Sequence, residues 1–240
     1  MAKVLALLFA VISCSCGVMK EAVRDNSNMV GPESVNSRPG IKPGPITYVA
    51  FGDSTGAGIG ATGGGYVARL FKRILEQRPG SRLVNRCVSG ATTADVLRQQ
   101  LDEGLRASPD VITLGIGIND IGHGVSPEQF ARNYEEILTR LRSGNKAPII
   151  VTNLPDISSA PRIPNSMRAQ YQQTIIRFNR KLEEIASKAG VVVFDAFTIT
   201  HEQLAAHPEY FSADGFHPSD RGYELWAEQM WPTVQNVIGR

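Results

Sequence analysis

A serine, a histidine and an aspartate stand where they could together cleave an ester. Ser54 follows a short apolar run, in the stretch I-T-Y-V-A-F-G-D-S-T-G of residues 46–56, and a glycine-rich segment comes next. This pattern is typical of a strand that ends in a tight turn with a serine at its tip. His217 lies near the other end of the chain, three residues after Asp214.

Acyl transfer by a serine requires a base within hydrogen-bonding distance, roughly 2.6–3.2 Å, and donors aimed at the oxygen that becomes negative. His217 is the candidate base, and Asp214 is the candidate partner of its second ring nitrogen. The candidate oxyanion donors are the backbone N–H groups of Ser54 and Gly90 and the side-chain amide of Asn119. The sequence therefore predicts a serine hydrolase that needs no metal or cofactor.

Apolar runs that read as strands alternate five times with segments of helical periodicity. The runs cover residues 46–51, 83–88, 111–116, 149–152 and 191–194. With right-handed crossovers, this alternation predicts an α/β fold, in which a five-stranded parallel sheet lies between two helical layers. Because the carboxyl ends of parallel strands meet at one edge, we expect Ser54, Gly90 and Asn119 to lie along that edge.

The helical segments carry clear start and stop signals. Ser126 followed by Pro127 predicts a helix start, Gly190 predicts a helix end, and Pro232 should kink or end the last helix. The expected buried face of the first helix consists of Val67, Leu70, Phe71, Ile74 and Leu75. The buried stripe expected after Ser126 consists of Phe130, Tyr134, Ile137, Leu138 and Leu141.

Several residues near the strand ends have supporting or structural interpretations. Asp53 and Asp120 are expected to bond backbone amides of their own turns and so hold Ser54 and Asn119. Residues 58–63 should form a flexible loop beside the serine, as part of the acyl pocket. Cys87 is expected to be packed in a strand. His201 and His207 have no evident partner and are interpreted as surface residues.

Four sequence blocks resemble, in order, those of the SGNH hydrolases, also called GDSL lipases and esterases. The blocks are Gly52-Asp53-Ser54, Asn85 through Ser89-Gly90-Ala91-Thr92, Gly117-Ile118-Asn119-Asp120 and Asp214-Gly215-Phe216-His217-Pro218. The resemblance spans residues 46–240, and its one departure is Thr55, where the name-giving motif has leucine. It implies a flavodoxin-like sheet, a Ser-His-Asp triad and a Gly90 amide in the oxyanion hole.

The same resemblance implies two-step hydrolysis of carboxylic esters through an acyl-enzyme. The expected substrate is a small acyl ester, which includes lipid and glycan esters, so an esterase, a lipase, a lysophospholipase-like enzyme and an acetyl esterase all fit. A thioesterase is an alternative. A second alternative is an exported binding protein that keeps the fold without the chemistry.

Three other motif readings compete for these residues. Residues 52–56 also fit the G-x-S-x-G nucleophile elbow, but the acid and the histidine then fall in the wrong places. Residues 58–63 fit G-x-G-x-x-G, but no acidic residue follows at the end of the next strand. Asp53, Asp120, Asp214 and His217 could surround a metal, yet no ligand spacing supports it.

The first 16 residues have the pattern of a secretory signal. Lys3 precedes an apolar run, residues 4–12, that is too short to cross a bilayer. The stretch ending at Cys14 resembles a bacterial lipobox, and an ordinary signal cut nearby is the alternative. Residues 17–45 are polar with several Gly-Pro pairs, which predicts a disordered tether. We therefore expect export to the bacterial cell envelope or periplasm, with membrane contact only through a lipid on Cys14.

The charge distribution gives no sign of a nucleic-acid partner. The chain has 25 basic and 23 acidic residues and a formal net charge of +2, without a block of either sign. Proteins that bind nucleic acids usually gather basic residues on one face or in one segment.

Overall fold

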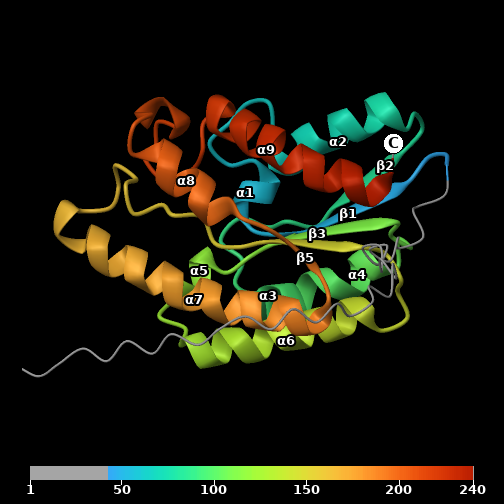
Figure 1. Cartoon of the computed structure of the whole chain (residues 1–240), viewed down its shortest axis with the longest axis horizontal. Coiled ribbons are helices and arrows are strands. Elements are labelled where there is room, and N and C mark those ends of the chain that lie inside the picture. Colours follow the sequence, from blue (N-terminus) through green and yellow to red (C-terminus); the bar gives the residue numbers. More distant parts are fainter. Residues whose placement is uncertain (1–42, 240) are drawn as a thin grey trace, which may run out of the picture. The chain divides into compact units, whose positions relative to one another are not determined.

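The computed structural model describes residues 43–239; the predicted signal, Cys14 and all but the end of the tether lie outside this range. Within it, five parallel strands form one sheet in the order β2-β1-β3-β4-β5 (Figure 1). The strands are β1 (Thr47–Gly52), β2 (Arg82–Asn85), β3 (Val111–Gly115), β4 (Ile149–Thr152) and β5 (Val192–Phe194). The predicted α/β class and the flavodoxin-like strand order are confirmed.

Helices follow the strands and cover both faces of the sheet (Figure 1). They are α1 (Ser54–Ala57), α2 (Tyr66–Gln77), α3 (Thr93–Asp95), α4 (Leu101–Leu105), α5 (Ile118–Gly122), α6 (Pro127–Arg142), α7 (Arg168–Ala189), α8 (Ala196–Leu204) and α9 (Asp220–Ile238). A π-helical stretch, Val96–Gln100, joins α3 to α4, and the 3-10 turns Asn165–Met167 and Pro208–Tyr210 precede α7 and α9.

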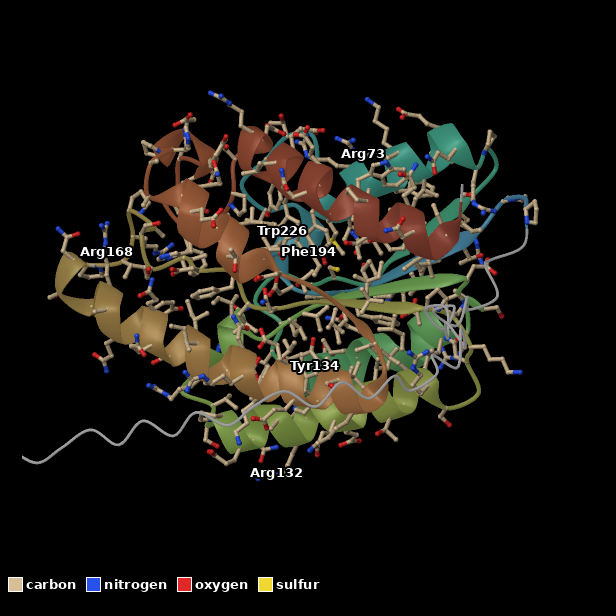
Figure 2. All side chains as sticks on the ribbon, viewed as in Figure 1. Arg73, Arg132, Tyr134, Arg168, Phe194 and Trp226 are labelled. Carbon is tan, nitrogen blue, oxygen red and sulfur yellow. The ribbon has the colours of Figure 1, made fainter. Side chains whose placement is uncertain are left out.

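Alternate residues of the strands belong to two separate hydrophobic clusters, one on each face of the sheet. Val49 and Phe51 of β1 point to the face covered by α6 and α7, whereas Tyr48 and Ala50 point to the face covered by α2 and α9. Figure 2 shows Tyr134 in the first layer and Trp226 with Phe194 in the second. The central strands β1, β3 and β4 are buried on both sides, which explains their continuous apolar sequences.

The side of the sheet on which successive strands are added changes between β2 and β3, so β1 and β3 flank a topological switch point. The connection from β1 leads to β2 on one side, and all later strands are added on the other side. In open parallel sheets, such a switch point leaves a crevice at the carboxyl ends of the two strands, where ligands bind. Gly52 of β1 and Gly115 of β3 are register partners there, and a Cβ on Gly52 would lie 2.4 Å from the Gly115 carbonyl oxygen.

Several local expectations are confirmed. Ser126 caps α6 by accepting a hydrogen bond from the Gln129 amide, and Gly190 ends α7 in a left-handed conformation. The five apolar residues expected to form the buried stripe of α6 are all buried.

Other expectations were wrong. The second strand ends at Asn85, not Val88, although the amides of Arg86 and Val88 still donate to the Ala50 and Gly52 carbonyls of β1. Cys87 therefore lies after the strand, where it packs against the cluster under α2 and α9. Leu75 is exposed rather than buried on α2. Pro232 does not end α9 but lies inside it, on its exposed side, where water can satisfy the carbonyl that proline leaves unbonded; a kink there stays a prediction.

Among residues 43–239, no helix is both long enough and apolar enough to span a membrane.

The contact between α4 and β1 allows a direct test of the packing. We expect Gly104→Ala to lower the free energy of unfolding by about 1–3 kcal/mol, because the new methyl group would meet the Phe51 ring at 2.3 Å. The control is Gly122→Ala in α5, where an added Cβ meets no described atom within 4 Å. Urea denaturation of both variants measures the difference, and equal stabilities would contradict the packing.

Candidate active site

Ser54 is the first residue of α1, directly beyond the end of β1. Asp53 is the N-cap of this helix, and its carboxylate accepts hydrogen bonds from the Thr55 amide at 2.9 Å and the Thr55 hydroxyl at 2.8 Å. The expectation that Asp53 bonds within its own turn is confirmed. The cap fixes the turn that carries Ser54, whose side chain is buried from bulk solvent.

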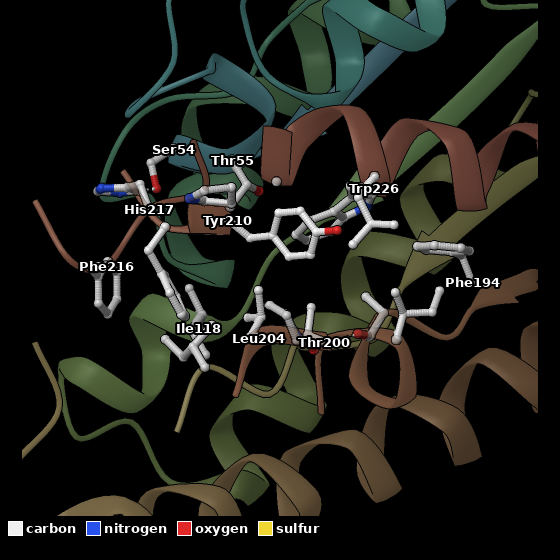
Figure 3. A pocket seen from close by; sticks show the side chains of 18 residues that line it. Ser54, Thr55, Ile118, Phe194, Thr200, Leu204, Tyr210, Phe216, His217 and Trp226 are labelled. Atoms are coloured by element: carbon white, nitrogen blue, oxygen red, sulfur yellow. Dashed lines mark hydrogen bonds between the residues drawn. The ribbon is translucent and has the colours of Figure 1, made fainter. Parts of the chain in front are cut away.

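His217 lies between Ser54 and Asp214. Its Nε2 atom is 3.0 Å from Ser54 Oγ, and its Nδ1 atom is 2.6 Å from Asp214 Oδ2 (Figure 3 shows the Ser54–His217 pair). The structure thus brings together the three side chains that the sequence singled out, although Ser54 and His217 are 163 positions apart.

The surroundings of Asp214 determine how His217 holds its proton. Partial burial acts to raise the pKa of Asp214, but hydrogen bonds from the His217 ring, the amides of His217 and Phe216, and the Ser212 hydroxyl outweigh it and hold the pKa well below its usual value. Asp214 is therefore a carboxylate that accepts the proton of Nδ1. In the neutral ring, Nε2 is then free to accept the hydroxyl proton of Ser54.

The candidate oxyanion donors lie at the ends of β1, β2 and β3. Within residues 43–239, the backbone N–H groups of Ser54 and Gly90 donate to no protein acceptor. Gly90 is exposed and has a φ of +79°, which favours glycine. Asn119 lies in α5, and its amide donates one hydrogen to the Ala91 carbonyl at 2.9 Å, which leaves its second hydrogen available.

Asp120 bonds its own backbone amide, as the sequence suggested, and also reaches beyond its own turn. Its carboxylate accepts the amide of Thr93 at 2.9 Å and the hydroxyl of Thr93 at 2.5 Å. Asn133 of α6 donates to the same hydroxyl at 2.9 Å. Asp120 therefore ties the segment after β3 to the segment after β2, the two segments that carry Asn119 and Gly90.

Gln100 is a positioning residue that the sequence did not reveal. Its buried side chain bonds both the N–H and the carbonyl group of Gly52. Oε1 accepts from the Gly52 amide at 3.0 Å, and Nε2 donates to the Gly52 carbonyl at 2.9 Å. Gln100 lies in the π-helical stretch, an irregularity that often marks functional sites. It fixes the backbone two residues before Ser54.

The glycine-rich loop is held in place rather than free. Asp220 at the start of α9 accepts the amides of Thr62 and Gly63, and the Tyr223 hydroxyl donates to the Ile59 carbonyl. Gly60 packs behind His217, where a Cβ would lie 2.8 Å from the histidine Cβ. The loop lies beside Ser54, as expected, but it supports the histidine and does not line the cavity, so its expected part in the acyl pocket was wrong.

A cavity opens beside Ser54 and extends between α8 and α9 (Figure 3). Eighteen residues line it, and most of their side chains are apolar. They are Ser54, Thr55, Ile118, Pro155, Ile157, Phe194, Ala196, Ile199, Thr200, Leu204, Tyr210, Phe211, Phe216, His217, Pro218, Gly222, Leu225 and Trp226. The loop after β4 contributes Pro155 and Ile157.

The other histidines take no part in this cluster. His201 has partners after all, because its Nδ1 lies 2.8 Å from the buried carboxylate of Asp156, which also accepts from Gln172. This contact holds the loop after β4 against α7 and α8. His207 lies beside Glu209 on the surface. In the described part of the chain, no three His, Cys, Asp or Glu side chains converge as metal ligands would.

The model of the GDSL-like Lipase/Acylhydrolase family matches residues 50–225, more than half of the chain. The chain therefore belongs to this family, and the resemblance seen in its four sequence blocks is confirmed. A GDSL-like esterase of Mycobacterium tuberculosis is 29% identical over 204 residues, which cover 82% of this chain and 64% of the relative. Esterase TesA of Pseudomonas aeruginosa is 26% identical over 200 residues, which cover 80% of this chain and 89% of the relative.

Solved structures share the fold. A catalytic mutant of an acetylxylan esterase from Geobacillus stearothermophilus superposes with a TM-score of 0.68 at 20% identity, covering 83% of this chain and 99% of the other. A lipase/acylhydrolase from Enterococcus faecalis gives a TM-score of 0.64 at 24% identity, covering 79% and 95%. At these identities the likeness supports the fold and leaves the substrate open.

Burial of Asp53 predicts a pH dependence of stability. Desolvation raises its pKa to about 6 from a normal value of 3.8, although the bonds from Thr55 act in the opposite direction. Because the folded pKa is the higher one, the folded state binds the proton more tightly. The free energy of unfolding therefore falls as the pH rises from about 4 to about 6, by about 3 kcal/mol at most.

Asp53→Asn removes this titration and keeps an acceptor for Thr55. We expect the stability of wild type relative to Asp53→Asn to decline across that pH window, as measured by urea denaturation at several pH values. Parallel curves for the two proteins would show that Asp53 titrates normally.

Proposed function

We propose that the protein is a serine esterase that cleaves carboxylic esters through an acyl-enzyme on Ser54. Membership of the lipase/acylhydrolase family supports ester hydrolysis in general. The observation that carries the specific mechanism is the chain of hydrogen bonds from Ser54 through His217 to Asp214. Nucleophile, base and orienting acid occur together in this order in serine hydrolases.

In the first step, Ser54 Oγ attacks the ester carbonyl carbon while its proton passes to His217 Nε2. Asp214 stabilises the imidazolium through Nδ1, and the negative oxygen is held by the amides of Ser54 and Gly90 and the second amide hydrogen of Asn119. The C–O bond to the alcohol then breaks, and the alcohol leaves with the proton from His217.

In the second step, His217 takes a proton from water, and the resulting hydroxide attacks the acyl carbon. A second tetrahedral intermediate forms on the same donors and collapses to release the carboxylic acid. The proton on Nε2 returns to Ser54 Oγ, which restores the starting state. Every proton in this cycle moves through one ring nitrogen, so the position of His217 limits both steps.

The catalytic residues differ in how far their substitution should lower kcat. Ser54→Ala and His217→Ala should each lower kcat by about 10⁴–10⁶-fold. Asn119→Ala should lower it by about 10²–10³-fold, because one oxyanion donor is lost. The control is His207→Ala, a surface histidine outside the cavity, which should retain wild-type turnover.

The measurement is the hydrolysis of 4-nitrophenyl esters by each variant. Wild-type turnover in Ser54→Ala would contradict the mechanism. A wild type that hydrolyses no ester or thioester would favour the binding-protein alternative.

We also propose that residues 1–16 direct export and that Cys14 carries the lipid anchor. The support is the charged, apolar and small-residue pattern of this segment. In a bacterial host, the full-length chain should incorporate labelled palmitate and sediment with membranes, whereas Cys14→Ser should do neither. An unlabelled, soluble wild type of reduced mass would instead indicate an ordinary cleaved signal.

A further inference from the structure

The cavity beside Ser54 connects the two hydrophobic clusters of the domain. Near Ser54 and His217, its wall contains Ile118 and Ile157, which belong to the cluster under α6 and α7. Its other end is formed by Phe194, Ala196 and Trp226, which belong to the cluster under α9. Figure 3 shows this arrangement, with Ser54 and His217 at one end and Phe194 at the other. Phe194 and Ala196 are buried, so the far end is closed.

The cavity offers few polar groups beyond its mouth. None of the described residues that line it is Asp, Glu, Lys or Arg. The Thr55 hydroxyl is bonded to Asp53. The Thr200 hydroxyl donates to backbone carbonyls of α8 and accepts the Asp156 amide. The remaining polar atoms of the lining are the Trp226 indole nitrogen, which is buried without a partner, and the Tyr210 hydroxyl. A sugar with several hydroxyls, or a charged head group, would lose more hydrogen bonds to water than these two groups can replace, whereas an alkyl chain would lose none.

The closed end favours the acyl part of the ester over the alcohol part. The alcohol must leave the site before water can attack, so it needs a path to solvent. The acyl group stays covalently bound to Ser54 through both steps. A dead-end cavity that begins at Ser54 fits the group that stays, and the exposed side near Gly90 is open to the group that leaves.

From these observations we propose that the cavity binds an unbranched aliphatic acyl chain longer than acetyl, and that Ile199 limits the chain length. This inference rests on the proposed esterase function. Ile199 lies on α8, lines the cavity and packs against the same cluster as Phe194, Ala196 and Trp226, which places it at the deep end. A larger side chain there shortens the cavity without touching the Ser54–His217 pair.

The kinetic test compares 4-nitrophenyl acetate, hexanoate and decanoate. For wild type, kcat/KM should rise by about fourfold per methylene until the cavity is filled. Ile199→Trp should lower the ratio of decanoate to acetate kcat/KM by about tenfold or more, because it excludes at least two methylenes. Glu202→Trp, on the exposed side of the same helix, is the matched control and should keep the wild-type ratio.

A binding test separates this inference from the esterase function. Isothermal titration of decanoate into Ser54→Ala should give binding, and the double variant Ser54→Ala/Ile199→Trp should bind much more weakly. If decanoate binds in this way but the wild type hydrolyses no ester, the alkyl-binding site is supported and the esterase function is rejected.

Two results would overturn the inference while the esterase stands. One is a wild type that prefers acetate, with no decanoate binding by Ser54→Ala. The other is a gain in rate when the alcohol of an acetate ester is lengthened, with no gain from longer acyl chains, because the cavity would then hold the alcohol. An unchanged decanoate-to-acetate ratio in Ile199→Trp would reject Ile199 as the residue that limits length.

Discussion

The arrangement of the site depends on one hydrogen bond, between His217 Nε2 and Ser54 Oγ, which joins the start of the domain to its end. Each partner is held by its own local structure. Ser54 is fixed by the Asp53 cap and by the two hydrogen bonds between the Gln100 side chain and the Gly52 backbone. His217 is fixed by Asp214 and by a short antiparallel bridge between Phe211 and Pro218. The distance between the two is set elsewhere, by how α9 packs on the first part of the domain.

That packing combines apolar contact with a polar seam. Helices α2 and α9 lie together on one face of the sheet, where Tyr66 stacks on Trp226 with ring centroids 5.1 Å apart. At their surface, Arg69 bonds both Asp220 and Glu224, and Asp220 also holds the glycine-rich loop. Each surface ion pair contributes little to the free energy of unfolding. The buried apolar contact therefore supplies most of the stability, and the ion pairs fix how α9 is positioned along α2.

The sequence was sufficient where the determining signals are local. Asp214 and His217 are three residues apart in one turn, Ser54 follows directly on a strand, and the cap at Ser126 is read from two adjacent residues. Continuous apolar runs correctly predicted the buried strands. Because strand exits of a parallel sheet share an edge, even the meeting of distant residues at one site could be inferred from their order along the chain.

The sequence was insufficient where a side chain bonds a distant segment. Asp120 reaches Thr93 across 27 positions, and Gln100 reaches Gly52 across 48, with no local pattern that indicates either contact. The partner of His201 could not be found for the same reason. The cavity also escaped prediction, because it forms only when α8 and α9 pack beside the end of β5. Tertiary contacts, not propensities, decide these features.

The central claim is that Ser54 is the reactive nucleophile, and covalent labelling tests it most directly. The folded protein would be treated with a tagged fluorophosphonate, digested and analysed by mass spectrometry. The account predicts one phosphonylated peptide, modified at Ser54, and no adduct in Ser54→Ala. An adduct at a different serine, or no adduct in a folded wild type, would contradict it.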